Sequence, residues 1–364
     1  MITTIIFIIV LAVLIFVHEL GHFIVARLAG IRVDAFKIGF GPKVFSWKRG
    51  ETEYGLNLIP FGGYVKIYGE NPEAEHVSGP DAARSMVNKP RWKQIAVLVA
   101  GVTFNFIFAW LLYTIVFTSG VTATTGGFEK YAQDFTNQRV MVTFVGQGSP
   151  AEKAGLVVGD IITGVTDSTS TISISNIQQL VNQHQGSSIG LVITRKDGVH
   201  TIQATPEKGI VVGAYAIGIG MDYVGDLRLP FFTAVWEGLH YTGVMIRDTT
   251  YGLYTFVAHI FQGTAHLSDV SGPVGIAGLV GNAAELGFTY LLMITALISI
   301  NLGVINLVPF PALDGGRVLF TLIEAVIRRR IPEKWTNSVN TVGFVLLMLL
   351  MVVVTYKDIA KLFK

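Results

Sequence analysis

The chain has 364 residues, of which 51% are hydrophobic and 14% charged, and its net charge is +2. Soluble domains usually carry about a quarter charged residues, so this composition indicates a membrane protein. A net charge this close to zero gives no reason to expect a nucleic-acid partner. The chain contains no cysteine, which excludes disulfides and thiolate metal sites. Any zinc must therefore be bound by His, Asp or Glu.

Four stretches are apolar enough to cross a bilayer as helices, which takes about 20 residues each. They cover residues 2–26 and 95–117, a third stretch from about residue 290 to a break at Pro309 and Pro311, and residues 339–356. The first stretch lacks a basic flank and a small-residue cleavage site. We therefore interpret it as a retained span and not as a signal peptide.

Basic residues predict the orientation of the spans, because Lys and Arg concentrate in cytoplasmic loops. The segment between the first and second spans and the short link between the third and fourth are both rich in these residues. Both segments therefore belong on the cytoplasmic side, and residues 121–227 belong on the outer side. Three lysines near the C-terminus weaken this bias slightly.

Residues 33–67 read as strands and not as a helix, because apolar residues alternate and an Arg49-Gly50 turn separates two extended stretches. The segment is too apolar and aromatic for a free loop, so we expect it at or in the membrane surface. The alternative is a small sheet that packs on the helices.

The segment 121–227 has a different sequence pattern from the apolar spans on either side of it. Residues 140–145 and 191–195 resemble strands and residues 177–183 a short helix, which predicts one small domain of mixed strand and helix. After it, apolar residues recur at three- and four-residue steps over residues 230–262, which predicts an amphipathic helix that contacts membrane lipid. The predicted domains are therefore 1–120, 121–227 and 228–364.

The strongest motif is His18-Glu19-Leu20-Gly21-His22, near the end of the first span. On a helix, residues four apart share a face, so both imidazoles can reach one metal ion with Glu19 beside the metal-bound water. The motif lies roughly 24 Å into a hydrocarbon core of about 30 Å. Ionisable side chains at that depth are costly and usually functional. We therefore predict a metal site and not a chance HExxH match.

A catalytic zinc ion usually has three protein ligands and a water, so the two imidazoles need a third partner. The best candidate is Asp314, which follows the helix-breaking Pro309 and Pro311. A carboxylate at membrane depth needs a partner, and zinc would supply one. The alternative is that Asp314 only caps the helix that resumes at about residue 317.

The HELGH motif and the stretch 306–315 resemble the site-2 protease family of intramembrane zinc metalloproteases. The stretches 61–65, 148–162 and 272–276 narrow this resemblance to the bacterial RseP-like subgroup, and it covers nearly the whole chain. The chain departs from the family in two ways. It has one PDZ-like segment where well-known relatives have two, and Val102 where many relatives carry proline.

The resemblance implies a set of zinc ligands: His18, His22 and Asp314. It further implies that Glu19 is the general base and that Asn306 contacts the substrate backbone or the oxyanion. The expected fold is a polytopic α-helical membrane protein with four transmembrane helices, a membrane-associated β-hairpin region and an inserted small α/β, PDZ-like domain. The expected substrates are single-pass membrane proteins already trimmed on their outer side, such as anti-sigma factors, or remnant signal peptides. The expected location is a bacterial inner membrane, with the site toward the cytoplasm and the PDZ domain outside.

Two further substrate contacts are predicted. An α-helical substrate hides its peptide bonds, so the hairpin around Gly62 and Gly63 could offer a strand edge to an unwound segment. The loop Ile217-Gly218-Ile219 resembles a carboxylate-binding loop that would hold a free C-terminus. The alternative is that Gly218 is a structural glycine in a strand.

Two other classes of protein are alternatives to the protease interpretation. A metal-ion transporter would distribute polar groups through several helices, whereas here they converge on one locus. A catalytically inactive scaffold that binds membrane proteins through its PDZ domain would not need Glu19. We assign no metal role to His240, His259 or His266.

Overall fold

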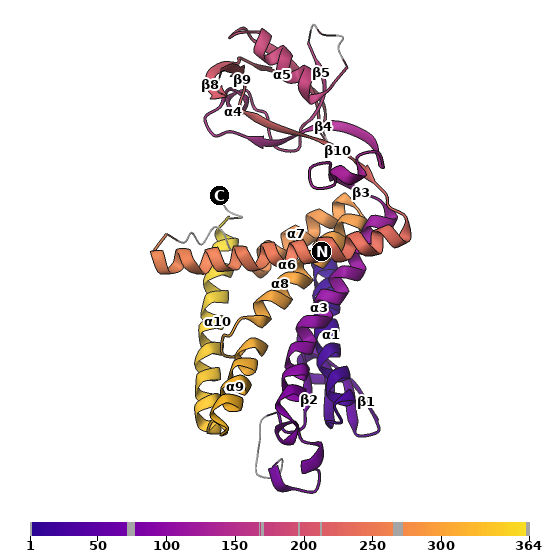
Figure 1. Ribbon diagram of the computed structural model, residues 1–364, viewed down its shortest axis with the longest axis vertical. Coiled ribbons are helices and arrows are strands. Elements are labelled where there is room, and N and C mark those ends of the chain that lie inside the picture. Colours follow the sequence, from indigo (N-terminus) through magenta and orange to yellow (C-terminus); the bar gives the residue numbers. More distant parts are fainter. Residues whose placement is uncertain are drawn as a thin grey trace. The chain divides into compact units, whose positions relative to one another are not determined.

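The computed structural model describes residues 2–70, 77–166, 168, 171–195, 197–211, 213–264 and 272–361. The chain forms two compact units (Figure 1). The first unit combines Met1–Val116 with Phe231–Lys364, and the second unit is Phe117–Pro230. We call them the membrane unit and the outer unit.

Four of the described helices are long and apolar enough to span a membrane. They are α1 (Ile2–Leu28), α3 (Arg91–Ser119), α8 (Phe288–Leu307) and α10 (Glu333–Lys361). All four predicted spans are therefore confirmed as helices, and the fourth extends furthest beyond its predicted range, from 339–356 to 333–361. The predicted break after the third span is also present, because α8 ends at Leu307 and α9 (Asp314–Ile327) begins a new helix.

Helix α7 (Pro273–Leu286) is an element that the hydropathy pattern does not indicate. Its 14 residues are too few to cross a bilayer. It is separated from α8 by Gly287, whose φ of 125° breaks the helix. Val280 of α7 is buried against Val10 and Leu14 of α1, so α7 supports the first half of the helix that carries HELGH.

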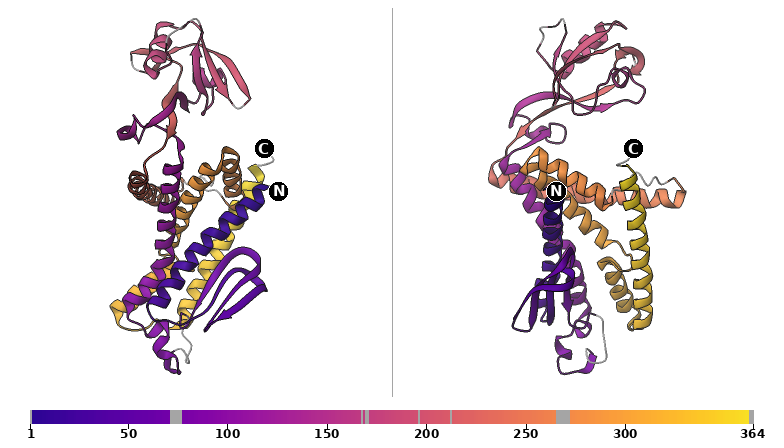
Figure 2. Two further views of the ribbon diagram at one scale, coloured as in Figure 1. Left: turned by 90° about the vertical axis from the view of Figure 1, so that its right-hand side faces the viewer. Right: turned by 180° about the vertical axis from the view of Figure 1, so that it is seen from behind.

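The segment after α1 folds into the predicted hairpin, formed by β1 (Val33–Arg49) and β2 (Thr52–Ile67). The two strands curl strongly, because Phe36 of β1 lies opposite both Val65 and Tyr54 of β2. The half nearest α1 packs on the helices and buries Phe36 and Val65 together with Val97 of α3. Figure 2 shows the hairpin alongside α1.

The turn half of the hairpin has a different surface, because large apolar side chains on it are exposed. They are Phe40, Val44, Phe45, Trp47, Leu56, Leu58 and Ile59. The packed half therefore agrees with the small-sheet alternative, while the turn half presents the kind of apolar surface that a membrane would cover.

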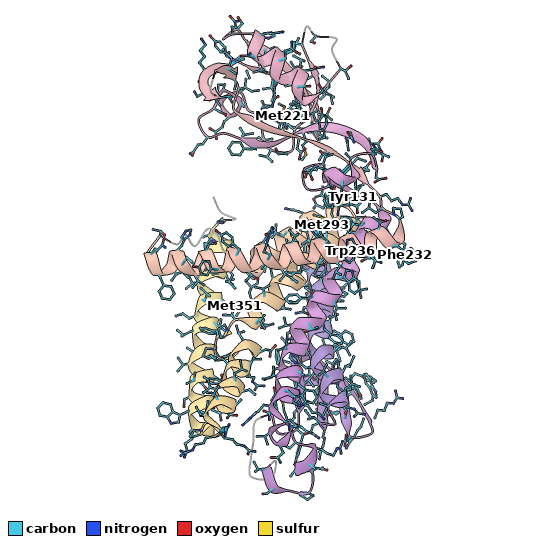
Figure 3. All side chains as sticks on the ribbon, viewed as in Figure 1. Tyr131, Met221, Phe232, Trp236, Met293 and Met351 are labelled. Atoms are coloured by element: carbon cyan, nitrogen blue, oxygen red, sulfur yellow. The ribbon has the colours of Figure 1, made fainter. Side chains whose placement is uncertain are left out.

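Helix α6 (Phe231–Gln262) occupies the segment that was predicted to be an amphipathic helix. Its small and polar residues Ala234, Glu237, Gly238 and Thr242 are buried. Trp110 of α3 donates its indole N–H to the carbonyl of Val235 at 2.9 Å. Phe232 and Trp236 are 85% and 67% exposed and are labelled in Figure 3. One side of α6 thus packs on the spans and leaves aromatic side chains outside the protein core.

The two basic segments lie at the same end of the membrane unit. Arg330, in the link before α10, donates to the side-chain oxygen of Asn88 at 3.2 Å. Arg91 at the start of α3 forms an ion pair with Glu324 of α9 at 2.7 Å. The short helices η1 (Ala82–Arg84) and η2 (Met86–Asn88) belong to this region. This arrangement agrees with assigning both basic segments to one side of the membrane.

The outer unit is built on a six-stranded antiparallel sheet with the order β3-β10-β4-β5-β6-β7. Its strands are β3 (Val121–Thr124), β4 (Phe135–Val145), β5 (Ile161–Val165), β6 (Ile189–Arg195), β7 (Gly198–Ala204) and β10 (Ile219–Leu227). Three short helices, η3 (Glu129–Tyr131), α4 (Pro150–Lys153) and α5 (Ile174–Gln183), and the pair β8 (Glu207–Val211) and β9 (Ala214–Ala216) complete it. The predicted strands at 140–145 and 191–195 and the helix at 177–183 are therefore present.

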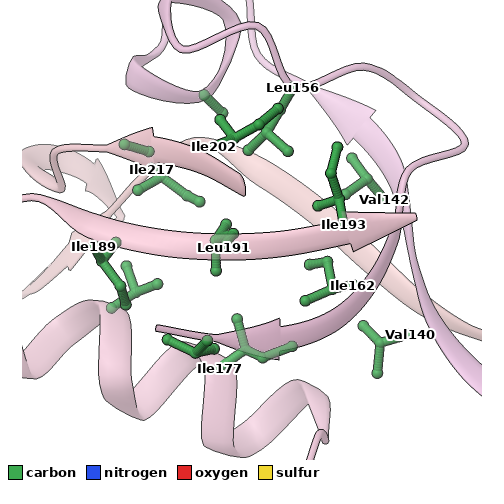
Figure 4. Packing of buried hydrophobic residues seen from close by; sticks show 14 residues of the cluster. Val140, Val142, Leu156, Ile162, Ile177, Ile189, Leu191, Ile193, Ile202 and Ile217 are labelled. Atoms are coloured by element: carbon green, nitrogen blue, oxygen red, sulfur yellow. The ribbon is translucent and has the colours of Figure 1, made fainter. Parts of the chain in front are cut away.

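The outer unit has a hydrophobic core of its own. Leu191 and Ile193 of β6 pack with Ile162 of β5 and Ile177 of α5, and all four are at most 2% exposed (Figure 4). Burial of each such side chain contributes roughly 1.5–3 kcal/mol. A separate core of this kind is what defines an independently folding domain.

Candidate metal centre

Helix α1 positions the two imidazoles of the HELGH motif. His18 and His22 are one turn apart and both are buried. Their Nε2 atoms are 3.2 Å apart, and the rings meet edge to face. The i, i+4 spacing therefore places both ring nitrogens at one point on the inner face of α1, as predicted.

Helix α3 presses directly on these rings because it carries a glycine there. A Cβ atom added at Gly101 would lie 2.7 Å from Cε1 of His18 and would overlap Nε2 of His22. Four residues earlier, the carbonyl of Val97 accepts a hydrogen bond from Nδ1 of His22 at 2.8 Å. A carbonyl can only accept, so this contact places the proton of His22 on Nδ1 and leaves Nε2 with a lone pair.

Asp314 completes the cluster from the break between α8 and α9. One carboxylate oxygen, Oδ2, lies 3.1 Å from Nε2 of His18 and 3.3 Å from Nε2 of His22. Asp314 is the first residue of α9, whose N-cap is Leu313, and among the described residues no side-chain cap hydrogen bond is present there. The geometry therefore favours the ligand hypothesis over the helix-cap alternative, because the carboxylate faces the imidazoles.

Ion pairs hold α9, and with it Asp314, against the first half of the chain. Arg317, one turn after Asp314, pairs with Glu70 in the segment that follows β2. Arg91 pairs with Glu324 further along α9. Two contacts on one helix restrict both its position and its rotation, which a ligand from a distant segment requires.

The three donors fit a zinc ion. Zinc bound by two imidazole nitrogens and a carboxylate oxygen at about 2.0–2.2 Å in a tetrahedron requires donor atoms about 3.3 Å apart. The observed separations are 3.1, 3.2 and 3.3 Å. Among the described residues, this is the group of His, Asp and Glu side chains whose donor atoms converge within 4.8 Å. Three protein ligands leave one position for water, as in catalytic zinc sites.

Glu19 lies between the metal centre and the hairpin. It follows His18 on α1, and the backbone of Val65 in β2 forms a hydrogen bond with its carboxylate. A Cβ atom added at Gly63 would lie 3.5 Å from Cγ of Glu19 and 2.9 Å from Cγ2 of Ile15. The hairpin therefore comes directly against the carboxylate, and the absence of a side chain at position 63 permits this approach.

The remaining predicted site residues occupy different places. Asn306 is half-buried in the last turn of α8, just before the break that precedes Asp314. Gly62 is in β2 with φ 104°, a backbone conformation that other residues rarely adopt. Ile217, Gly218 and Ile219 belong to the outer unit and line a groove of about 450 Å³ beside α5. His240 and His259 lie on α6 and are not members of the described cluster, and His266 lies outside the described residues.

Two residues of α3 at the site were not predicted from the sequence. Gly101 packs against both imidazoles, and Asn105 places its side-chain amide 3.0 Å from Nδ1 of His18. Their four-residue spacing places them on one face of α3, which is the available signal. Nothing in that spacing shows which helix the face meets.

Comparison with known proteins agrees with this geometry. Residues 6–350 match the model of peptidase family M50, so the chain belongs to this family of membrane metallopeptidases. A Clostridium perfringens protein, whose name assigns it provisionally to the zinc metalloproteases, is 38% identical over 347 residues that cover 95% of each chain. The zinc metalloprotease RasP of Geobacillus kaustophilus is 31% identical over 423 aligned residues, covering 98% of this chain and 97% of that one.

The family and the cluster together define the class of enzyme. The chain is a zinc metalloendopeptidase, and Zn²⁺ is its cofactor. The four apolar helices and the family indicate a multi-pass inner-membrane protein whose substrates are membrane proteins and which contacts lipid.

Proposed function

We propose that the protein hydrolyses peptide bonds within or near transmembrane segments, with His18, His22 and Asp314 as the zinc ligands and Glu19 as the general base. The observation that carries this proposal is the convergence of the three donors within a helical membrane unit, with a catalytic-type carboxylate one residue from a ligand. A structural zinc site would use four protein ligands and would need no Glu19.

When bound, zinc lowers the pKa of a coordinated water to about 7 and polarises the scissile carbonyl. Glu19 takes a proton from the attacking water and delivers it to the leaving amine. The hydrogen bond from the backbone of Val65 orients the Glu19 carboxylate, since it fixes one side of the carboxylate against β2. Burial of the site in the membrane unit limits the water around these groups, which strengthens their electrostatic interactions.

The edge of β2 that faces away from β1 binds the substrate and presents it to Glu19. In the described part of the chain, residues 63–67 of β2 pair with β1 only, so one edge of this segment has no strand partner. An unwound segment of substrate can add to that edge as a strand, which exposes its peptide bonds beside Glu19. Gly63 keeps the edge close to the carboxylate, and Gly62 supplies the local bend. Asn306 donates its amide to the substrate backbone or to the developing oxyanion.

The outer unit acts as a substrate filter with a PDZ fold. Residues 219–223 of β10 pair with β4 on one side, and α5 lies beside this end of the strand across the groove of about 450 Å³. Ile217, Gly218 and Ile219 line that groove and hold a free C-terminal carboxylate. The substrates are single-pass proteins that have already been trimmed outside, such as anti-sigma factors, or remnant signal peptides.

The zinc site faces the cytoplasm and the outer unit lies outside a bacterial inner membrane, an orientation that the basic segments support. The domain boundaries proposed for this arrangement are 1–120, 121–227 and 228–364. All of the proposed ligands and Glu19 belong to the membrane unit, so the outer unit regulates access and performs no chemistry.

The decisive experiment uses the purified full-length protein and a model single-pass substrate. We expect cleavage within the transmembrane segment, loss of cleavage with a zinc chelator and recovery when zinc is returned. A deletion variant that lacks residues 138–221 should still cut a short, pre-trimmed substrate, with lower selectivity. A full-length enzyme that contains zinc but cuts only soluble peptides would contradict the proposal, and a correctly inserted deletion variant without activity would contradict the role of the outer unit.

A further inference from the structure

Asn105 of α3 is fully buried beside the metal centre, and its side chain has an unusual set of contacts. Its Nδ2 lies 3.0 Å from Nδ1 of His18, on the opposite side of the imidazole from Asp314. Its Oδ1 is buried and has no hydrogen-bond partner among the residues that the structure describes. A buried polar atom without a partner costs about 1–3 kcal/mol, which calls for an explanation in a functional site.

The two imidazoles differ in the group that faces Nδ1, the ring nitrogen that points away from Asp314. Nδ1 of His22 faces the carbonyl of Val97, which can only accept a hydrogen bond. Nδ1 of His18 faces an amide, which offers either a donor or an acceptor at the same position after a half-turn about its last bond. The oxygen and nitrogen of an amide have nearly the same size, so the rotation requires no repacking.

The orientation of this amide determines the tautomer of His18. When the NH₂ group faces Nδ1, the imidazole proton is on Nε2, and Nε2 donates to Asp314 over the 3.1 Å contact. When Oδ1 faces Nδ1, the proton is on Nδ1, and Nε2 has a lone pair directed at the cluster. Only the second arrangement allows Nε2 to bind a metal ion.

We propose that Asn105 is a positioning residue for His18: its side-chain oxygen accepts the Nδ1–H of the imidazole and so holds Nε2 ready to bind zinc. This inference rests on the proposed role of His18 as a ligand. It gives the imidazole of His18 a hydrogen-bond acceptor at Nδ1, as the carbonyl of Val97 does for the imidazole of His22. Outer partners of this kind typically change metal affinity by about 10–100-fold when they are removed.

The fold holds Asn105 in place independently of its amide. The hydroxyl of Ser299 in α8 donates to the backbone carbonyl of Asn105 at 2.8 Å, which ties α3 to α8 at this level. One turn earlier, Gly101 brings α3 against both rings. The backbone of Asn105 is therefore anchored on two sides, so the amide can rotate without movement of the helix.

The test measures zinc affinity of the full-length protein by competition with a chelator, together with the visible absorption spectrum after substitution with Co²⁺. Asn105→Leu removes the acceptor and should weaken zinc binding by about 10–100-fold. Asn105→Asp keeps an acceptor but cannot donate, and should retain most of the wild-type affinity and the wild-type Co²⁺ spectrum. Thr103→Val is the matched control, because it changes an exposed side chain of the same helix that donates to the carbonyl of Val99 at 3.0 Å, and it should bind zinc normally.

The outcomes separate this inference from the ligand assignment. His18→Ala should lose zinc outright, and a His18→Ala protein that binds zinc normally would contradict the ligand set itself. If His18→Ala loses zinc while folded Asn105→Leu binds it as tightly as wild type, the role of Asn105 is wrong and the ligand set stands. Should Asn105→Leu fail to fold, Asn105→Asp decides, because weak zinc binding by a folded Asp variant would show that an acceptor is not what His18 needs.

Discussion

The outer unit and the membrane unit each shield an aspartate from solvent, Asp160 almost completely and Asp314 with 22% of its side chain exposed, and they stabilise it in different ways. Asp160 of the outer unit is 1% exposed and accepts two hydrogen bonds from Arg195, at 2.6 and 2.8 Å. Asp314 of the membrane unit lies against two imidazoles, His18 and His22. A buried carboxylate requires a countercharge. For Asp160 the chain itself supplies the countercharge, from Arg195. Imidazoles that bind a metal are neutral, so the carboxylate of Asp314 keeps a net negative charge that suits a divalent cation.

This comparison separates a structural carboxylate from a metal ligand on physical grounds. Arginine gives a fixed charge and a rigid fork of donors, so the Asp160–Arg195 pair is complete within the protein. In the Asp314 cluster, one carboxylate oxygen and two imidazole nitrogens converge on one point. Such a cluster is stable when a cation occupies that point. Substitutions in the two units should therefore have different effects, on zinc and cleavage in the membrane unit and on stability in the outer unit.

The largest effect is expected for Glu19→Gln. The amide keeps the shape of the side chain but removes the base, so cleavage of a transmembrane substrate should fall by about 10²–10⁴-fold. Zinc content should remain at the wild-type level, because Glu19 is not among the converging donors. Parallel cleavage assays and metal analysis check this, and comparable cleavage by mutant and wild type would remove Glu19 from the mechanism.

The next effect concerns Asp314. Asp314→Ala removes a ligand and should lower zinc affinity by more than about 100-fold, which exceeds the effect of an outer partner. Asp314→Asn should fold more easily yet still bind zinc poorly, since a neutral amide is a weaker donor. If Asp314 served only as a helix cap, Asn would replace it almost equally well. Full zinc occupancy and normal activity of Asp314→Asn would therefore exclude the aspartate from the site.

The sequence was sufficient for parts of the molecule that depend on local patterns. The spans, the break at Pro309, the hairpin turn and the HELGH motif follow from hydropathy, proline chemistry and helical spacing. The sequence could also nominate Asp314, because a carboxylate at membrane depth has few explanations.

Features that depend on contacts between distant segments were not accessible in this way. Asn105 and His18 are 87 residues apart, and no local pattern in α3 shows that Asn105 faces an imidazole. The curl of the hairpin, in which Phe36 pairs on both sides, results from bulges that alternation alone does not encode. Helix α7 escaped prediction because it is short, glycine-containing and bounded by Gly287.

A smaller effect is expected when the aspartate pair of the outer unit is broken. Arg195→Met leaves the buried Asp160 without its partner and should lower the free energy of unfolding of this unit by about 3 kcal/mol, since part of the guanidinium already reaches water. Asp160→Asn leaves an arginine that solvent can satisfy and should cost about 1 kcal/mol. Hydrogen exchange of the β5 and β6 amides in the full-length protein measures both.

Cleavage of a pre-trimmed substrate should persist in Arg195→Met, because the outer unit contributes no proposed ligand. The matched control is Asp197→Asn, whose carboxylate is exposed and contacts His200 at 3.1 Å. Exposed pairs contribute little, so its effect on stability should stay below about 1 kcal/mol. Equal effects of Arg195→Met and Asp197→Asn would show that burial does not distinguish the two pairs.

The smallest effect is a dependence of the outer unit on acid. Burial alone would raise the pKa of Asp160, but hydrogen bonds from Arg195 and from the backbone of Val157 outweigh it and hold the pKa below its ordinary value. An aspartate in an unfolded chain titrates near pH 4. Because the folded pKa is the lower one, the stabilisation is complete at neutral pH and is lost as the pH falls from about 4 through the folded pKa. The difference in unfolding free energy between wild type and Asp160→Asn should therefore be constant from pH 7 to about 5 and shrink below about 4. A difference that stays constant down to pH 3 would mean that the charge of Asp160 does not stabilise the fold.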